Sequence, residues 1–461
     1  MKNNILIIVD TLKIGGGSDK FAAILGTELH EQGYNISYLT LMDGNPKYSF
    51  KGDYYTLNES DIYGNNFKRG LDLLRYSSRI KSICEGLKID TVISAGDPAN
   101  FQALISSYLF GNKVRLIITQ HMNPGIFLDS PLKYRLIKFF YPRADKVVCV
   151  SREVEKILNN DYGIENTLTI YNMVDIQKNT RLSMEQLPDK YRSLFERNNP
   201  VKGNMGHKIG ETSSNHKNLE KNTDHKNHAG NTGNGSKEGN TDYENNEDNT
   251  PHKNLAGKPN FNFINIGRFD RQKGQWFLIR SFRQVVDQYK NAQLFILGEG
   301  DLRGDLEDLI LELDLVENVF LLGDQENVFP FLVNSDCFVF SSLWEGLPLS
   351  LIEALSVNLP VISTDCKTGP REILCPELDL DETINYPYLG EHAILTKPFP
   401  NEIIFKNLDE VSLIESEQIL ANIMIKIIGD PDLRKKYAHK ELITHNFYKD
   451  KIVTQWNKLL K

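Results

Sequence analysis

The sequence lacks long hydrophobic runs, an excess of basic residues and paired cysteine motifs, and each absence excludes a class of protein. No stretch approaches the roughly 18 apolar residues that a helix needs to span a bilayer, so we expect no transmembrane segment. The formal net charge of −8 argues against a nucleic-acid binder, which needs a basic surface to displace counterions. The five cysteines contain no C-x-x-C spacing, which favours reduced core thiols in a cytoplasmic protein.

Residues 201–258 differ in composition from the rest of the chain. They include 12 Asn, 8 Gly and 8 Lys but a single aromatic residue, Tyr243. Such a segment cannot bury enough apolar surface to offset the entropy of ordering its backbone. We therefore predict a disordered, charge-balanced insert, in which His207, His216 and His225 lack the rigid frame that a metal site requires.

The two halves that flank this insert alternate short apolar runs with helical patterns, which is typical of parallel α/β sheets. The expected strands are 5–9, 35–40, 91–94, 114–119 and 146–150 in the first half, and 261–266, 293–297, 319–322, 337–341 and 360–364 in the second. Helical spacing predicts helices over 276–289 and 302–313 and a largely helical tail over 416–461, broken at 429–431. The fold class is therefore α/β, with two doubly wound domains whose ligands lie at the carboxyl ends of the strands.

Two glycine-rich segments follow expected strands. Gly15, Gly16 and Gly17 open the first helix, where glycine allows a ligand to approach the backbone and a helix N-terminus attracts anions. A tight turn without a ligand is the alternative at this position. Gly298 and Gly300 lack the spacing of a dinucleotide site, so we interpret them as a turn.

The second half carries a stronger signal for phosphate binding. Gly267 and Arg268 follow a strand, and Lys273 comes five residues after Arg268, before a helix. Two cations in one strand-to-helix loop suit a diphosphate, because arginine can contact two oxygens while lysine acts as a point charge. Taken alone, a solvated basic loop is an equal alternative.

Two glutamates frame the next strand-to-helix connection. Glu345 stands in the loop, Gly346 and Pro348 mark the helix start, and Glu353 lies inside the helix. Eight residues of helix span about 12 Å, a separation that fits the two ends of a nucleotide-sugar. A single glutamate would be interpreted as surface solvation, but a pair placed around a helix start favours a binding site.

With these motifs in view, the chain resembles the retaining GT-B-fold glycosyltransferases of the group 1 or family 4 type, whose E-x7-E signature is matched by Glu345 and Glu353. The segment 369–373, Gly-Pro-Arg-Glu-Ile, is similar to bacterial surface-polysaccharide enzymes that use UDP-linked hexoses or N-acetylhexosamines. The resemblance implies two Rossmann-like domains facing a cleft. The implied organisation is an acceptor-binding domain over 1–175, a linker with the insert over 176–259, a donor-binding domain over 260–430, and a terminal helix over 431–461 that crosses back to the first domain.

The resemblance also implies a role for each site residue. The catalytic set is Glu345, His121, Arg268 and Lys273. The donor-binding set is Gly15, Gly16, Gly17, Gly267, Arg268, Lys273, Asn327, Val328, Glu345, Gly346, Leu347, Leu349 and Glu353. Within these sets Glu345 contacts the sugar, Glu353 binds the ribose hydroxyls, the two cations and the 346–349 loop stabilise the diphosphate, and Asn327-Val328 faces the base. His121 lines the acceptor side, and Glu372 is expected near the donor.

No cofactor and no metal are expected. The segments 379–381 and 430–432 spell D-x-D, which binds metal in a different glycosyltransferase fold, but both lie in loop-like context away from the phosphate cations. The nucleotide-sugar is therefore expected as a substrate that is bound without a metal ion.

The predicted activity is transfer of a hexose or N-acetylhexosamine from a UDP-sugar to a lipid-linked saccharide, with retention, in capsule or lipopolysaccharide biosynthesis. The alternatives are a GT-B-fold sugar-nucleotide epimerase, a non-catalytic partner subunit and an NAD-dependent two-domain enzyme. Residues 131–146 alternate basic with apolar and aromatic side chains. They predict either peripheral contact with an anionic membrane, on its inner face, or an ordinary amphipathic helix packed on its own domain.

Overall fold

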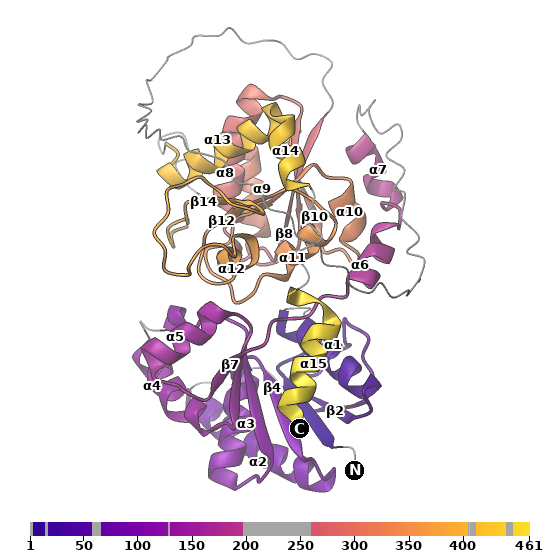
Figure 1. The fold of residues 1–461 in the computed structure, drawn as a ribbon, viewed down its shortest axis with the longest axis vertical. Coiled ribbons are helices and arrows are strands. Elements are labelled where there is room, and N and C mark those ends of the chain that lie inside the picture. Colours follow the sequence, from indigo (N-terminus) through magenta and orange to yellow (C-terminus); the bar gives the residue numbers. More distant parts are fainter. Residues whose placement is uncertain are drawn as a thin grey trace, which may run out of the picture. The chain divides into compact units, whose positions relative to one another are not determined.

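The computed structural model describes most of the chain outside the predicted insert (Figure 1). The described residues are 3–13, 17–57, 66–127, 130–196, 260–403, 405, 412–438 and 446–461. Gly15, Gly16 and the whole predicted insert, with its three evenly spaced histidines, lie outside the described residues.

The N-terminal domain contains a parallel sheet of seven strands in the order β3-β2-β1-β4-β5-β6-β7. The strands are β1 (Asn4–Val9), β2 (Asn35–Thr40), β3 (Asp53–Thr56), β4 (Thr91–Ala95), β5 (Arg115–Gln120), β6 (Lys146–Cys149) and β7 (Thr167–Thr169). The connecting helices are α1 (Gly17–Glu31), α2 (Asn66–Gly86), α3 (Asp97–Phe110), α4 (Pro131–Phe140) and α5 (Arg152–Tyr162). The sequence predicted the five central strands but missed β3 and β7, because these edge strands are only partly buried and show no apolar run.

The C-terminal domain repeats this architecture with a sheet in the order β10-β9-β8-β11-β12-β14-β13. Its strands are β8 (Phe261–Ile266), β9 (Ala292–Leu297), β10 (Val319–Gly323), β11 (Cys337–Phe340), β12 (Val361–Thr364), β13 (Tyr388–Leu389) and β14 (Ile394–Thr396). Its helices are α8 (Gln275–Gln288), α9 (Arg303–Glu312), α10 (Phe329–Val333), α11 (Leu349–Ser356), α12 (Pro370–Leu374), α13 (Glu415–Gly429) and α14 (Pro431–Tyr437). Among the described strands of this sheet, only β13 runs antiparallel to its neighbour. The predicted α/β fold with two doubly wound parallel sheets is confirmed.

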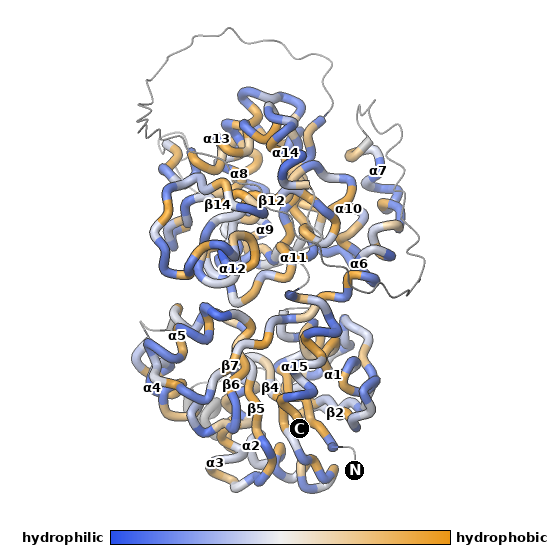
Figure 2. Tube along the Cα trace, in the orientation of Figure 1, coloured by the Kyte–Doolittle hydropathy of each residue, from blue (hydrophilic) through white to orange (hydrophobic). Residues whose placement is uncertain are grey.

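Both faces of each sheet are covered by helices, which is why the strands read as continuous apolar runs (Figure 2). In β1, Leu6 and Ile8 pack into the cluster formed with α2 to α5, whereas Ile5 and Ile7 face the cluster that contains α1. This alternation follows from the two-residue repeat of a strand.

Two segments cross from one domain to the other. The last helix, α15 (Lys449–Leu460), packs on the N-terminal sheet, where Trp456 is buried beside α1. Residues 176–196, which we expected to be linker, instead form α6 (Ile176–Ser183) and α7 (Asp189–Glu196). Phe195 of α7 stacks on Phe295 of β9 at a ring distance of 4.0 Å, so these helices belong to the C-terminal core.

All five cysteines are buried and free. Among the helices in the described ranges, none is both long enough and apolar enough to cross a bilayer.

Candidate functional site

The site is built on the carboxyl ends of three neighbouring strands in the C-terminal sheet. Strand β8 lies between β9 and β11, and β12 is the next strand beyond β11. The order of connection reverses between β8 and β11, and this is the position at which open parallel sheets bind ligands. The loops after β8, β11 and β12 therefore gather at one edge.

The central contact of the site joins Lys273 to Glu345. The Nζ atom of Lys273 lies 2.6 Å from Oε1 of Glu345, and Gln272 donates a 3.0 Å hydrogen bond to Oε2 of the same carboxylate. Both charged side chains are largely buried. A buried ion pair needs partners for its remaining polar atoms, and Gln272 provides one for the second oxygen of the Glu345 carboxylate.

The backbone around Glu345 fixes this carboxylate in place. The Glu345 amide donates to the carbonyl of Lys367 in the loop after β12, at 2.8 Å. Thr368 donates its hydroxyl hydrogen bond to the Glu345 carbonyl at 2.7 Å. The loops after β11 and β12 are thus joined directly at Glu345.

Arg268 lies in the same loop as Lys273, but its partner is different. Its guanidinium forms a 3.0 Å ion pair with Asp270 and its side chain is 55 % exposed. The loop is held from behind by the 298–300 turn: a Cβ on Gly298, whose φ is +146°, would lie 2.0 Å from the Gly267 carbonyl. Gly298 therefore serves close backbone packing, in agreement with our interpretation of this segment as a turn.

Glu353 lies in α11 and is paired with a residue that sequence reasoning missed. Its carboxylate forms an ion pair with Lys20 of α1 in the N-terminal domain. Burial lowers the pKa of Lys20, but the adjacent Glu353 carboxylate outweighs this effect and the net pKa is raised. The only sequence signal for Lys20 is its place in the first turn after the glycine-rich segment.

His121 and Gly346 meet across the two domains. A Cβ on Gly346 would lie 1.9 Å from the His121 carbonyl oxygen, so the loop that leads to Leu347 and Leu349 runs against the end of β5. The His121 ring contacts Phe21 and lies 2.8 Å from the Thr119 hydroxyl. Burial lowers the pKa of His121 to about 3, so the imidazole is neutral at physiological pH.

The remaining predicted residues are less closely tied to the Lys273–Glu345 pair. Gly17 begins α1 with open space where a Cβ would point. The Asn327 amide donates to the carbonyl of Leu182 at 2.9 Å and to Glu185 at 2.8 Å, so this side chain binds the C-terminal end of α6. Val328 caps α10.

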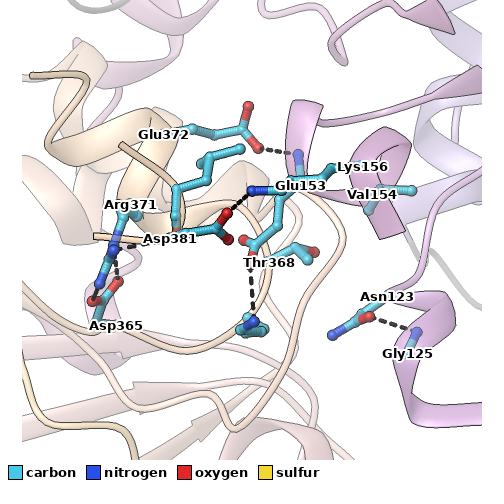
Figure 3. Close-up of polar contacts among 12 residues, drawn as sticks. Asn123, Gly125, Glu153, Val154, Lys156, Asp365, Thr368, Arg371, Glu372 and Asp381 are labelled. Carbon is cyan, nitrogen blue, oxygen red and sulfur yellow. Dashed lines mark hydrogen bonds and ion pairs between the residues drawn. The ribbon is translucent and has the colours of Figure 1, made fainter. Parts of the chain in front are cut away.

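The charged motifs in the loops after β12 have structural partners (Figure 3). Arg371 pairs with Asp365 and Asp381 pairs with Lys156. Glu372 accepts hydrogen bonds from the start of α5, and its expected place near the donor stays a prediction. The second D-x-D segment begins with Asp430, which caps α14 by accepting from the Leu433 amide at 2.9 Å. Binding of the donor without a metal ion stays a prediction.

Comparison with known proteins identifies the family. The model of "Glycosyltransferase Family 4" matches residues 15–178, and that of "Glycosyl transferases group 1" matches residues 246–379. An uncharacterised glycosyltransferase of Methanocaldococcus jannaschii is 39 % identical over 400 residues, which cover 84 % of this chain and 83 % of the relative. The chain belongs to the group 1 glycosyltransferases.

Two further proteins resemble this glycosyltransferase. An N-acetylgalactosaminyltransferase of Campylobacter jejuni is 29 % identical over 300 residues, covering 64 % of this chain and 63 % of that one. The crystal structure of Anabaena HepE in complex with UDP and glucose has a TM-score of 0.65 and 16 % identity, with 99 % of each chain covered. The likeness to HepE confirms the GT-B fold. The prediction of a glycosyltransferase enzyme is likewise confirmed, which sets aside the NAD-dependent and non-catalytic alternatives.

Proposed function

We propose that the enzyme transfers a hexose or N-acetylhexosamine, with retention, from a UDP-sugar to a saccharide carried on a lipid diphosphate. The full name of the Campylobacter relative describes a diphospho-undecaprenol-linked acceptor, and the HepE structure holds UDP and glucose. Both names support a nucleotide-sugar donor and a saccharide acceptor in glycan assembly.

The observation that carries this proposal is the buried Lys273–Glu345 pair at the joined ends of β8 and β11. Departure of the nucleotide builds negative charge on a diphosphate and positive charge on the sugar carbon. Lys273 and Arg268 stabilise the diphosphate, and the Glu345 carboxylate accepts hydrogen bonds from sugar hydroxyls. Glu353 does the same for the ribose diol, since a carboxylate can accept two hydroxyl hydrogens.

The bond changes follow a front-face attack. The acceptor oxygen forms a bond to the anomeric carbon on the side from which the diphosphate oxygen leaves. The hydroxyl proton passes to that departing oxygen, and the free nucleoside diphosphate is the second product. Neutral His121 contributes as a hydrogen-bonding group, because its lowered pKa makes it a poor proton carrier at physiological pH.

We also propose that the surface around α4 contacts an anionic membrane. Leu132 is 70 % exposed, Phe139 is exposed two turns further along α4, and the Arg143 guanidinium lies 3.7 Å from the centre of the Phe139 ring. Ile137 on the opposite face is fully buried in the domain core. An apolar and basic face on a firmly packed helix suits the headgroup region of a bilayer that carries a lipid-linked acceptor.

Vesicle sedimentation tests this surface. Leu132→Ser should reduce binding to phosphatidylglycerol vesicles by at least about threefold, by loss of buried apolar area. The matched control is Leu311→Ser, an equally exposed leucine on α9 of the other domain, which should leave binding unchanged. Equal loss in both variants, or no binding by the parent enzyme, contradicts the membrane proposal.

A thermal-shift screen of UDP-, GDP- and ADP-sugars tests the donor, because a ligand that binds only the folded state raises the unfolding midpoint. The best donor is then incubated with lipid-diphosphate saccharides, and the anomeric configuration of the product is read by NMR. An inverted product contradicts retention, and an interconverted UDP-sugar without a new glycosidic bond supports the epimerase. Activity in the presence of EDTA tests the expectation that no metal is required.

A further inference from the structure

A carboxylate of the C-terminal domain caps a helix of the N-terminal domain. Oε2 of Glu372, on α12, lies 3.0 Å from the Arg152 amide at the start of α5. Oε1 lies 3.5 Å from the Glu153 amide (Figure 3). The Tyr171 hydroxyl donates to Oε2 at 3.0 Å and the Arg152 side chain does so at 3.4 Å. The Glu372 side chain is 0 % exposed, so this contact is shielded from water.

The start of α5 is well suited to receive this carboxylate. The first amides of a helix have no partner within the helix, and they carry a partial positive charge. Ser151 caps the Val154 amide at 3.3 Å, which leaves the two amides before it for Glu372. The first amides of α5 are thus hydrogen-bonded partly by Ser151 of the same domain and partly by Glu372 of the other domain.

On its own domain, Glu372 lies in α12, shortly after a loop that contacts the backbone of Glu345. The neighbouring Arg371 is fixed by Asp365 at the end of β12 and by the carbonyl of Glu382 at 2.6 Å. The loop between β12 and α12 also carries Thr368, which donates to the Glu345 carbonyl at 2.7 Å. One short segment therefore connects the Glu345 backbone to the first turn of α5.

We propose that Glu372 is a positioning residue, which fixes the N-terminal domain relative to the donor site so that the acceptor hydroxyl is held in line for transfer. The inference rests on the proposed function, because it assumes that the donor binds to one domain and the acceptor to the other. Transfer between two bound substrates depends steeply on their separation, and an error near 1 Å can cost about 100-fold in rate. Glu372 acts through α5 and does not touch the sugar.

Two other contacts between these elements provide a contrast. Lys156 and Asp381 form an ion pair whose carboxylate is mostly exposed, and Lys367 lies 3.9 Å from Glu153. An exposed pair such as Lys156–Asp381 contributes little to stability, because water screens its charges. Asp381→Asn is therefore a matched control, since it also removes a negative charge that contacts α5.

The test compares Glu372→Gln with Asp381→Asn. For Glu372→Gln we expect kcat to fall at least about tenfold and the acceptor KM to rise, while the Kd for UDP stays within about twofold. Asp381→Asn should leave all three within about twofold. If Glu372 had a merely structural role, Glu372→Gln would lower the unfolding midpoint but would not lower kcat while leaving the Kd for UDP unchanged.

A distance measurement tests the inference without the sugar substrates. The five native cysteines are buried, so cysteines introduced at the exposed positions Lys113 and Lys290, one in each domain, can be labelled selectively for energy transfer. Glu372→Gln should broaden the distribution of distances between the labels, and Asp381→Asn should not. This measurement separates failure of the inference from failure of the proposed function, because it needs no active donor.

Several outcomes would overturn the proposal. The first is an unchanged distance distribution together with an unchanged kcat in Glu372→Gln. The second is a loss of UDP affinity as large as the loss of kcat, because that result would put Glu372 in the donor site. If Glu372→Gln does not fold, Tyr171→Phe serves instead, because it removes one donor to the same carboxylate. It should change kcat and the distance distribution in the same direction by a smaller amount, and its equality with the parent enzyme would refute the role.

Discussion

The Cα atom of Gly346 faces the carbonyl oxygen of His121 so closely that a Cβ would come within 1.9 Å of it. No real Cβ tolerates such a contact, and a backbone carbonyl cannot rotate away as a side chain can. The absence of a side chain at Gly346 thus allows this loop of the C-terminal domain to lie against the end of β5.

Gly346→Ala should therefore reduce kcat at least about tenfold, because the loop or β5 must shift to admit the methyl group. Gly304→Ala in α9 is the matched control, since a Cβ there meets nothing within 4 Å. Steady-state kinetics and thermal unfolding of both variants make the comparison. Full activity of Gly346→Ala would mean that the contact with His121 is unimportant for transfer.

Removal of either member of the Lys273–Glu345 pair should reduce turnover strongly. We expect at least a tenfold loss for Glu345→Ala and for Lys273→Ala, equivalent to about 1.4 kcal/mol of transition-state stabilisation. Each variant also leaves a largely buried charge without its partner, so the double variant should lose less stability than the sum of the single variants. Lys51→Met, which breaks an exposed 2.7 Å pair with Glu31, is the control. Near-normal turnover in both single variants would refute the assigned roles.

The proposed contact between Glu353 and the ribose can be tested with a pair of nucleotides. Calorimetry should show that the parent enzyme binds UDP more tightly than 2′-deoxy-UDP, and that Glu353→Ala loses this preference, because the hydroxyl then has no carboxylate partner. Lys20→Met breaks the same ion pair but keeps the carboxylate, so it should retain the preference. A preference that survives in Glu353→Ala would place the ribose elsewhere.

Glu153 should make stability depend on pH. Burial raises the pKa of its carboxyl to about 7; Glu372 and Asp365 add to the rise, and Lys367 and Arg371 oppose it. Between pH 4.5 and 7 the folded state therefore holds a proton that the unfolded state has released, so stability falls as the pH rises through this window. Glu153→Gln removes this dependence.

Urea unfolding at pH 5 and at pH 8 measures this effect. The free energy of unfolding of the parent enzyme should fall by about 2–3 kcal/mol more between pH 5 and pH 8 than that of Glu153→Gln. This follows from about 1.4 kcal/mol for each unit by which the pKa is raised. A difference between variant and parent that is the same at both pH values would show that Glu153 does not titrate in this window.

The sequence predicts the chemistry within one domain better than the contacts between domains. Lys273 and Glu345 could be predicted because each follows a buried strand, and parallel strands bring their carboxyl ends to one edge. Lys20 and the partner of Glu372 could not, since no local pattern specifies which side chain of a second domain will lie opposite a given carboxylate. Strands β3 and β7 were missed for a related reason, because these half-buried edge strands have no distinctive hydropathy.

The course of the chain limits how this enzyme can be dissected. The indole of Trp456 in α15 is buried in the hydrophobic cluster that also contains side chains of α1 and β1. A fragment that stopped before the insert would lack α15 and would expose the apolar side chains of α1 that this helix covers. We expect such a fragment to aggregate unless α15 is supplied as a separate peptide. Fragment complementation with α15 supplied in trans, rather than simple truncation, is accordingly the way to obtain the N-terminal domain on its own.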